Sequence, residues 1–387
     1  MPRRHGWIAR QARDARRLGR QARTPARRTT SRRGGQLQVR VGFMNVAKDR
    51  PSFGLSAAAA PSEGRVNQRH AGQAATRHNR PMTKPIAGVW PVLPTPFRPD
   101  GTPDEASLAA VAAYALRAGV DGVVYPGVAS EYESLTPDER THLVDVVAAA
   151  CKDRGALIVG GSAADPAVTH AVMRQAARLG AAAVMVMAPR DRSAAADIAD
   201  FFGTAAAVAD VPIMLQNAPP PAGSGLAVDT VLEIARAVPA IAYVKEEALP
   251  SGARISRLIA GAPATLRGVL GGAGGRYITD ELARGAVGTM PAVELAELHV
   301  ALFAAHRMGD RAAVRRWFNR MLPILNLQAV FRWALTKEVL RRRGIVAHAG
   351  KRASGAELDG GDHRELTECL AELVDVLDPP VSRPAPA

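Results

Sequence analysis

From Gly88 onward, short apolar runs alternate with helix-length amphipathic runs, and this repeat limits the possible folds more than any other pattern in the chain. The short runs lack the polar–apolar alternation of a sheet with one wet face, and are typical of parallel strands covered on both faces. The expected strands are 88–95, 121–126, 157–161, 182–187, 212–216, 241–245, 265–270 and 286–289. The expected helices are 104–118, 137–152, 166–179, 194–209, 228–237, 251–260, 276–284 and 291–308.

Eight such units predict an α/β fold, a (β/α)8 TIM barrel, which typically takes roughly 250 residues. A doubly wound open sheet is the alternative, but it rarely needs eight regular units and no dinucleotide-binding motif is present. Further helical patterns near 310–327, 328–343 and 361–376 predict a C-terminal helical extension. We therefore expect three parts: a basic leader (1–81), the barrel (82–308), and the extension with its tail (309–387).

Positive charge is concentrated in residues 1–81, which hold 19 of the 50 Lys and Arg residues but only three acidic residues. The remaining residues carry 31 basic and 33 acidic side chains, so the body has no positive excess and a nucleic-acid partner is not expected. We expect the leader to be disordered, because it shows no helix or strand period. A mitochondrial transit peptide, an Arg-rich RNA-binding tail and a true translation start at Met82 are the alternatives.

Other classes of protein are disfavoured by what the sequence lacks. Cys151 and Cys369 lie in apolar helical patterns, which favours buried thiols and a reducing compartment such as the cytoplasm. No apolar run approaches the roughly 18 residues that span a bilayer. The histidines show no metal-binding spacing, and the glycine-rich residues 268–275 match no nucleotide-binding motif, so we expect neither metal nor cofactor. Close approach of the backbone to the substrate, or a tight turn between strand and helix, is expected to explain these glycines.

Lys245 ends the sixth expected strand, and sites in such barrels form at the C-terminal ends of the strands. A lysine attacks a carbonyl only as the neutral amine, which burial favours. The two-residue period places Glu247 on the same face, whereas Glu246 should point to the helices or cap the next one. The pattern predicts a nucleophilic lysine beside a carboxylate. A lysine that reaches solvent from a strand end is the alternative.

Three segments resemble the dihydrodipicolinate synthase/N-acetylneuraminate lyase family of Schiff-base lyases: Leu93-Pro-Thr-Pro-Phe97, Asp121-Gly-Val-Val-Tyr-Pro-Gly-Val-Ala-Ser-Glu-Tyr-Glu-Ser-Leu-Thr-Pro-Asp-Glu-Arg140 and Tyr243-Val-Lys-Glu-Glu247. The resemblance runs from about Ile86 to Val346. It implies that Lys245 forms an imine with a 2-oxo acid. It also implies that residues 128–131 bind the substrate carboxylate through backbone N–H groups and the Ser130 hydroxyl, although a local turn hydrogen bond is the alternative for Ser130. The other expected substrate-binding residues are Thr95, Ala129, Asn217 and Gly271.

The sequence departs from the family pattern at three places, two at or after the end of the fifth strand and one after the fourth. Gln216 stands where most members have a proton-shuttling tyrosine, and an amide cannot titrate near neutral pH. Pro221 stands where dihydrodipicolinate synthases keep an arginine. After the fourth strand, Pro189-Arg-Asp-Arg192 replaces a tyrosine-bearing phrase. These departures argue against dihydrodipicolinate synthase activity.

The phrase Gln216-Asn-Ala-Pro219, with Lys245 and Glu247, resembles the 2-keto-3-deoxy-L-arabonate dehydratase branch of the family. Dehydration needs an imine as electron sink, a base for the C3 proton and an acid for the C4 hydroxyl. We expect Glu247 to act as base or acid and Gln216 to orient a hydroxyl. Glu131 is a second, weaker candidate for the base or acid, and a structural role is the alternative for this residue.

The expected partner is therefore a small-molecule 2-oxo acid, bound without an added cofactor by a homo-oligomer (dimer or tetramer), with no membrane partner. An aldolase, or a condensation with pyruvate, begins with the same imine and stays open. A non-catalytic barrel that binds an oxo acid and a pyridoxal-phosphate enzyme are alternatives of other classes.

Overall fold

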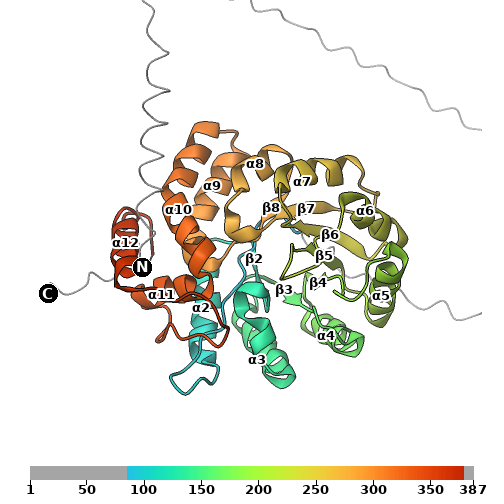
Figure 1. The fold of residues 1–387 in the computed structure, drawn as a ribbon, viewed down its shortest axis with the longest axis horizontal. Helices are drawn as coiled ribbons and strands as arrows, with labels where there is room; N and C mark the ends of the chain where they lie inside the picture. The colour runs from blue at the N-terminus through green and yellow to red at the C-terminus, as the bar shows by residue number, and fades with distance from the viewer. Residues whose placement is uncertain (1–84, 379–387) are drawn as a thin grey trace, which may run out of the picture. The chain divides into compact units, whose positions relative to one another are not determined.

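The structure is a computed structural model that describes residues 85–378. Within them, eight parallel strands form one sheet in the order β1-β8-β7-β6-β5-β4-β3-β2, with helices around it (Figure 1). The strands are β1 (Gly88–Val89), β2 (Gly122–Tyr125), β3 (Ala156–Gly160), β4 (Ala183–Met187), β5 (Ile213–Asn217), β6 (Ile241–Glu246), β7 (Gly268–Gly271) and β8 (Gly288–Thr289). The predicted (β/α)8 barrel is thereby confirmed.

Helices follow the strands and form the outer layer. Those of the barrel are α2 (Glu105–Arg117), α3 (Pro137–Cys151), α4 (Pro166–Leu179), α5 (Ala195–Val208), α6 (Val228–Ala237), α7 (Ser251–Ala260), α8 (Ile278–Ala283) and α9 (Ala296–Arg307). Short 3-10 turns are η1 (Val128–Ser130), η2 (Tyr132–Ser134), η3 (Ala273–Gly275) and η4 (Val293–Leu295). The C-terminal helices are α10 (Arg311–Phe331), α11 (Trp333–Arg342) and α12 (Gly360–Ala371).

The predicted first strand, 88–95, is longer than the regular strand in the structure, which ends at Val89. Pro91 and Pro94 have no backbone N–H and cannot continue a regular ladder. The segment nevertheless stays extended, because Val92 bridges Val124 of β2 on one side and Ala292 on the other. This bridge connects the two ends of the sheet and brings the barrel close to full closure.

Two apolar clusters hold the barrel. One fills its interior with residues from alternate strand positions, among them Trp90, Ile158, Met214 and Leu270. The larger cluster lies between the strands and the helices. The strands are apolar on both faces because each face contacts one of these clusters, as expected for parallel strands.

The helix starts follow the local sequence signals. Thr136 accepts a hydrogen bond from the Glu139 N–H at 3.1 Å, and the Glu139 carboxylate accepts one from the Thr136 N–H at 2.9 Å. Asp165 caps α4 in a similar way, accepting from the Ala167 N–H at 2.8 Å. Such caps satisfy N–H groups that have no partner inside the helix.

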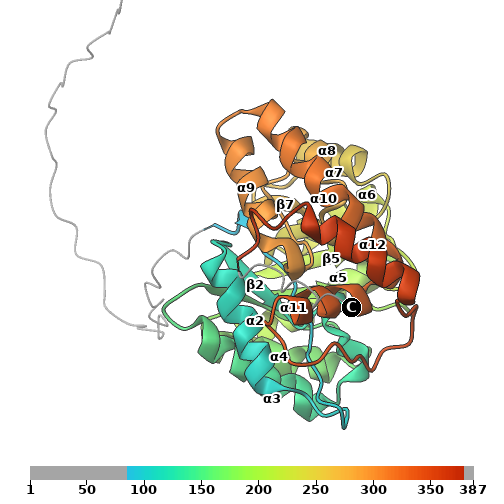
Figure 2. The same ribbon diagram turned by 90° about the vertical axis from the view of Figure 1, so that its left-hand side faces the viewer.

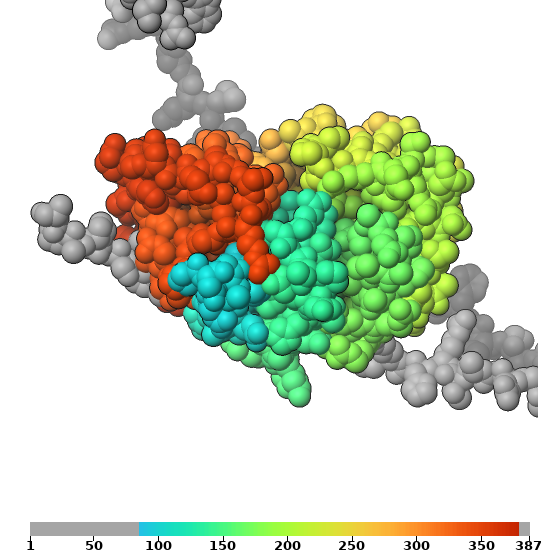
Figure 3. Space-filling model, turned by 60° about the horizontal axis from the view of Figure 1, so that its bottom comes forward, coloured from blue at the N-terminus to red at the C-terminus, as the bar shows by residue number. Residues whose placement is uncertain are grey.

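The C-terminal extension packs against the barrel. Helix α10 packs against α9, α11 and α12, and α11 lies beside α2 (Figures 1 and 2). In Figure 3 the red C-terminal residues lie directly against the blue and teal surface, where Arg352 bonds to Gly101 and Glu139. The extension therefore contacts the N-terminal third of the barrel as well as its last helix.

Two smaller expectations can also be compared with the structure. Cys151 and Cys369 are buried free thiols, as predicted, and burial raises the pKa of each to about 11. Across residues 85–378, none of the helices combines the length and the apolar character needed to cross a bilayer.

Candidate active site

Lys245, Glu247 and Gln216 meet at the C-terminal mouth of the barrel. Parallel pairing of β5 with β6 puts Gln216 beside Lys245, and Glu247 lies two residues further on the same face. The Lys245 Nζ is 3.2 Å from the Glu247 Oε1, and the Gln216 Nε2 donates to the Glu247 Oε2 at 2.7 Å. Lys245 and Gln216 are buried, so this polar group is shielded from bulk water.

Burial alone would raise the pKa of Glu247. The positive charge of Lys245, the Ala273 N–H at 2.9 Å and the Gln216 amide outweigh burial and lower the pKa of this carboxyl below its ordinary value. Glu247 is therefore held as a carboxylate against the lysine amine. An ionised carboxylate at this distance can accept a proton from the amine or from a bound substrate.

The glycine-rich residues after β7 make room for this pair. A Cβ on Gly272 would lie 2.5 Å from the Glu247 Oε1 and 2.7 Å from the Lys245 Cε. Gly274 and Gly275 adopt φ values of 71° and 83°, which side chains rarely tolerate. The tight turn expected for these glycines is confirmed, and Gly272 in addition leaves room for the Lys245 and Glu247 side chains.

A cavity of about 300 Å³ lies beside Lys245 and Glu247. Its lining includes residues that the sequence analysis missed, because they come from η3 and from the distant helices α10 and α11. These residues are Arg276, Gln328, Arg332, Trp333 and Thr336. A larger cavity of about 530 Å³ reaches Gln216 from between α3 and α4, but neither Lys245 nor Glu247 lines it.

The predicted carboxylate-binding loop forms η1, and Ala129 lines the cavity beside Lys245. Ser130 and Thr95 lie beneath this loop. The Ser130 hydroxyl donates to the Leu93 carbonyl and accepts from the Gly127 N–H, and the Thr95 hydroxyl donates to the Ser130 carbonyl at 2.7 Å. Both hydroxyls thus hold the loop in shape, which corresponds to the turn hydrogen bond considered as the alternative for Ser130.

Asn217 and Gly271 lie on the opposite face of the sheet from Lys245, because each pairs in register with Glu246. The Asn217 amide donates to Glu246 at 2.9 Å and to the Leu226 carbonyl. A Cβ on Gly271 would lie 1.8 Å from the Glu281 Oε2. Asn217 and Gly271, which the sequence suggested as substrate-binding residues, therefore face the helix layer, since neighbouring strand residues face opposite sides.

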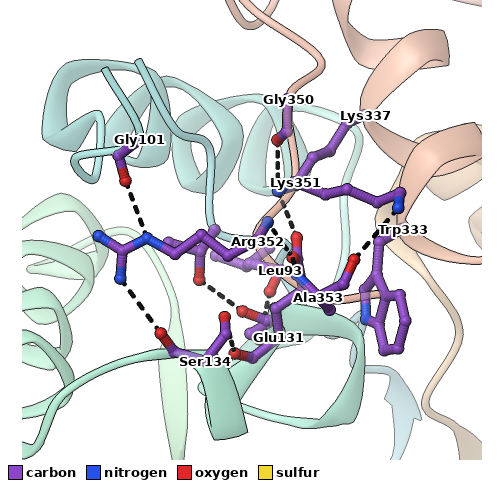
Figure 4. A network of polar contacts seen from close by, with 12 residues as sticks. Leu93, Gly101, Glu131, Ser134, Trp333, Lys337, Gly350, Lys351, Arg352 and Ala353 are labelled. Carbon is purple, nitrogen blue, oxygen red and sulfur yellow. Dashed lines mark hydrogen bonds and ion pairs between the residues drawn. The ribbon is translucent and has the colours of Figure 1, made fainter. Parts of the chain in front are cut away.

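Glu131 has its own set of partners, drawn in Figure 4. Its carboxylate forms a fully buried ion pair with Lys337 of α11. It also accepts hydrogen bonds from the Arg352 and Ala353 N–H groups at 2.8 and 2.7 Å. Lys337 donates in addition to the Gly350 carbonyl at 2.8 Å. Glu131 therefore joins the end of η1 to the C-terminal extension, which is the structural role considered for it.

The replaced phrase after β4 has a similar linking role. Arg190 pairs with Glu133 of η2 at 2.8 Å and donates to the Ala222 carbonyl at 2.9 Å. These contacts connect the loops that follow β2, β4 and β5. An arginine cross-link thus stands where the family pattern has a tyrosine.

A buried lysine–carboxylate pair at the C-terminal mouth of a (β/α)8 barrel defines a barrel enzyme with its site at the usual end of the strands. The model of the dihydrodipicolinate synthetase family matches residues 85–372. The chain belongs to this family, and it is a lyase of that family.

Three relatives illustrate the range of similarity. L-2-keto-3-deoxyarabonate dehydratase from Azospirillum brasilense is 28% identical over 301 residues, covering 76% of this chain and 96% of that protein. 4-Hydroxy-tetrahydrodipicolinate synthase from Exiguobacterium is 30% identical over 264 residues, covering 67% and 89%. The crystal structure of dihydrodipicolinate synthase from Rhodopseudomonas palustris aligns with a TM-score of 0.69 and 26% identity, over 74% of this chain and 98% of that one.

Proposed function

We propose that this protein dehydrates a 2-keto-3-deoxy sugar acid through a Schiff base on Lys245. The observation that carries the proposal is the contact between Lys245, Glu247 and Gln216 at the barrel mouth. The name of the Azospirillum relative, a dehydratase of such an acid, supports it.

The proposed reaction begins when the Lys245 amine attacks the C2 carbonyl and water leaves, which forms an iminium ion. Glu247 can accept the lysine proton at 3.2 Å, and the neutral amine is the nucleophile. The backbone N–H groups of η1 near Ala129, which lines the cavity, are the proposed partners of the substrate carboxylate, because a loop that leads into a helical turn presents N–H donors to an anion.

In the second step a base removes the C3 proton, and the electron pair moves into the iminium to give an enamine. The enamine then expels the C4 hydroxyl, which takes up a proton and leaves as water. Glu247 is the proposed base and acid, because it is the ionised carboxylate nearest to Lys245. Gln216 holds Glu247 and cannot itself transfer a proton.

The absence of a titratable side chain at position 216 favours dehydration over aldol cleavage. Cleavage would release pyruvate and an aldehyde from the same imine. A coupled assay with lactate dehydrogenase distinguishes the two reactions. Release of pyruvate at the rate of substrate loss would replace the dehydratase assignment with the aldolase.

The test of the shared first step is borohydride reduction in the presence of pyruvate and other 2-oxo acids, read by intact mass and peptide mapping. We expect one adduct, on Lys245, and Lys245→Ala should lose both adduct and turnover. Lys152→Ala, at an exposed lysine that ends α3, is the control and should retain both. An adduct on another lysine, or full turnover by Lys245→Ala, would refute the mechanism.

A further inference from the structure

Two guanidinium groups line the cavity that holds Lys245 and Glu247. Arg276 follows η3, and Arg332 stands at the junction of α10 and α11. Gln328 connects them, because its side-chain Oε1 accepts from the Arg276 Nη1 at 2.7 Å and its carbonyl accepts from the Arg332 N–H at 2.9 Å. The two arginines therefore belong to one local arrangement on one wall of the cavity.

Within residues 85–378, the hydrogen bonds and ring contacts of both guanidinium groups are with neutral groups, and Arg276 also interacts at longer range with the buried Glu294 carboxyl. Arg276 bonds to the Gln328 amide, and the Arg332 guanidinium lies 4.4 Å from the centre of the Trp333 ring. Three other arginines that are covered to a similar or greater degree than Arg276 each have a carboxylate partner. These pairs are Arg254 with Glu246, Arg343 with Glu297 and Arg352 with Glu139. Arg276 is half-buried and Arg332 is exposed, and neither has an ion-pair partner within 4 Å in the described part of the chain.

The backbone here is shaped around these side chains. Arg332 has φ 45° and ψ −112°, a conformation that is strained for a residue with a side chain and that glycine adopts more easily. A Cβ on Gly274 would lie 2.8 Å from the Gln328 Oε1 and 3.2 Å from the Arg276 Nη1. The chain thus has glycine where Arg276 and Gln328 need room, and arginine where the backbone favours glycine.

A count of charges indicates what the cavity can bind. Among the residues that line the cavity, Lys245 and Glu247 balance one another, so Arg276 and Arg332 leave two positive charges in excess. The buried Glu294 carboxyl, which interacts with the charge of Arg276, offsets one of them only when it is ionised, and burial raises its pKa to about 7. The carboxylate of an ordinary 2-oxo acid balances one of them. A substrate with a second anionic group balances both, and paired guanidinium groups suit a carboxylate or a phosphate.

We propose that Arg276 and Arg332 form a site for a second anionic group, so that the preferred substrate is a dianionic 2-oxo acid with a carboxylate or phosphate at its far end. This rests on the proposed function, whose substrate class it narrows. The cavity of about 300 Å³ is at the small end of ligand sites, which suits a short chain of about five or six carbons.

The test compares 2-oxoglutarate with 2-oxovalerate, which share a five-carbon chain and differ in a carboxylate against a methyl group. For the borohydride-trapped adduct on Lys245, we expect the half-saturating concentration of 2-oxoglutarate to be at least about tenfold lower. Arg276→Gln and Arg332→Gln should each reduce this ratio several-fold, and the double variant should bring it close to one. Arg311→Gln, at an exposed residue of α10, is the control and should keep the wild-type ratio.

Each outcome bears on the proposal. Equal affinity for the two acids, or a ratio that the double variant leaves unchanged, overturns the second-anion site. Adducts with pyruvate but no preference for a dianion overturn this inference alone, whereas no adduct with any 2-oxo acid overturns the proposed function as well. A parallel comparison of 2-keto-3-deoxygluconate, which ends in a hydroxyl, with its 6-phosphate tests for a distal phosphate, as the first comparison tests for a distal carboxylate.

Discussion

At the scale of single residues, Glu247 and Glu246 show how much one position along a strand matters. Glu247 faces Lys245, and that charge helps to keep its pKa low against the effect of burial. Glu246 faces the helices, where Arg254 and Asn217 hold it, yet burial raises its pKa above the ordinary value. Two adjacent glutamates thus have opposite environments, and only Glu247 can reach a molecule bound to Lys245.

Glu247→Gln should therefore separate the two steps of the proposed reaction. The amide keeps the size of the carboxylate and can still hydrogen-bond to Lys245, so imine formation should persist. Turnover should fall by roughly 10²–10⁴-fold, the usual contribution of a general acid or base. The rate of borohydride trapping and kcat, measured on the same protein, provide the check.

Glu246→Gln is the matched control. It should lower Tm, because it removes the ion partner of Arg254, but it should change trapping and turnover in the same proportion.

The assignment of Glu247 as base and acid also fixes the sign of the pH dependence. A lowered pKa keeps Glu247 ionised as pH falls, so the acid limb of kcat/KM should lie below the usual range of a glutamate. Parallel losses of trapping and turnover in Glu247→Gln would show that Glu247 serves imine formation instead.

At the scale of elements, the Glu131–Lys337 pair connects η1 to α11 and to residues 350–353 (Figure 4). Glu131 has φ 57°, so the turn between η1 and η2 adopts a conformation that is unfavourable for this residue type. The buried pair offsets this cost. The η1 loop is therefore held in place from the C-terminal extension as well as from the barrel.

Removal of one partner of the Glu131–Lys337 pair should lower the free energy of unfolding more than removal of both. Lys337→Met leaves the buried Glu131 carboxylate without its cation, and we expect a loss of about 3–5 kcal/mol in the free energy of unfolding. The double variant Lys337→Met with Glu131→Gln should recover part of this loss. Urea unfolding of the single and double variants gives the coupling between the two residues.

The exposed pair of Arg320 with Asp375 provides the comparison, and Arg320→Met should cost less than about 1 kcal/mol. If Lys337→Met cost no more than this control, the buried pair would not hold the two elements together. Slower borohydride trapping in the folded double variant would indicate that the pair also sets the position of η1.

At the scale of the whole molecule, the family match begins at residue 85, close to where the described structure begins. Residues 1–81 are rich in arginine and lack a core-forming pattern. We therefore expect removal of residues 1–81 to leave Tm and turnover unchanged. A fall in Tm of several degrees would show that these residues stabilise the barrel; the predicted disorder of the leader itself lies outside the described residues.

The sequence by itself determined the barrel, because eight apolar runs with helices between them are local patterns, which can be recognised without knowing the tertiary contacts of each segment. It also determined the Lys245–Glu247 pair, since the two-residue period of a strand puts both on one face. The helix starts at Thr136 and Asp165 could also be predicted from the sequence, because a helix cap involves residues only two or three positions apart.

Only the tertiary structure decided which other side chains reach Lys245. Arg276 and Arg332 come from separate segments that meet through Gln328, and no period in the sequence links them. The orientation of Ser130 and Asn217 also depended on distant partners, the Leu93 carbonyl and Glu246. A strand or helix is specified by near neighbours, whereas the wall of a cavity is specified by packing between elements far apart in the chain.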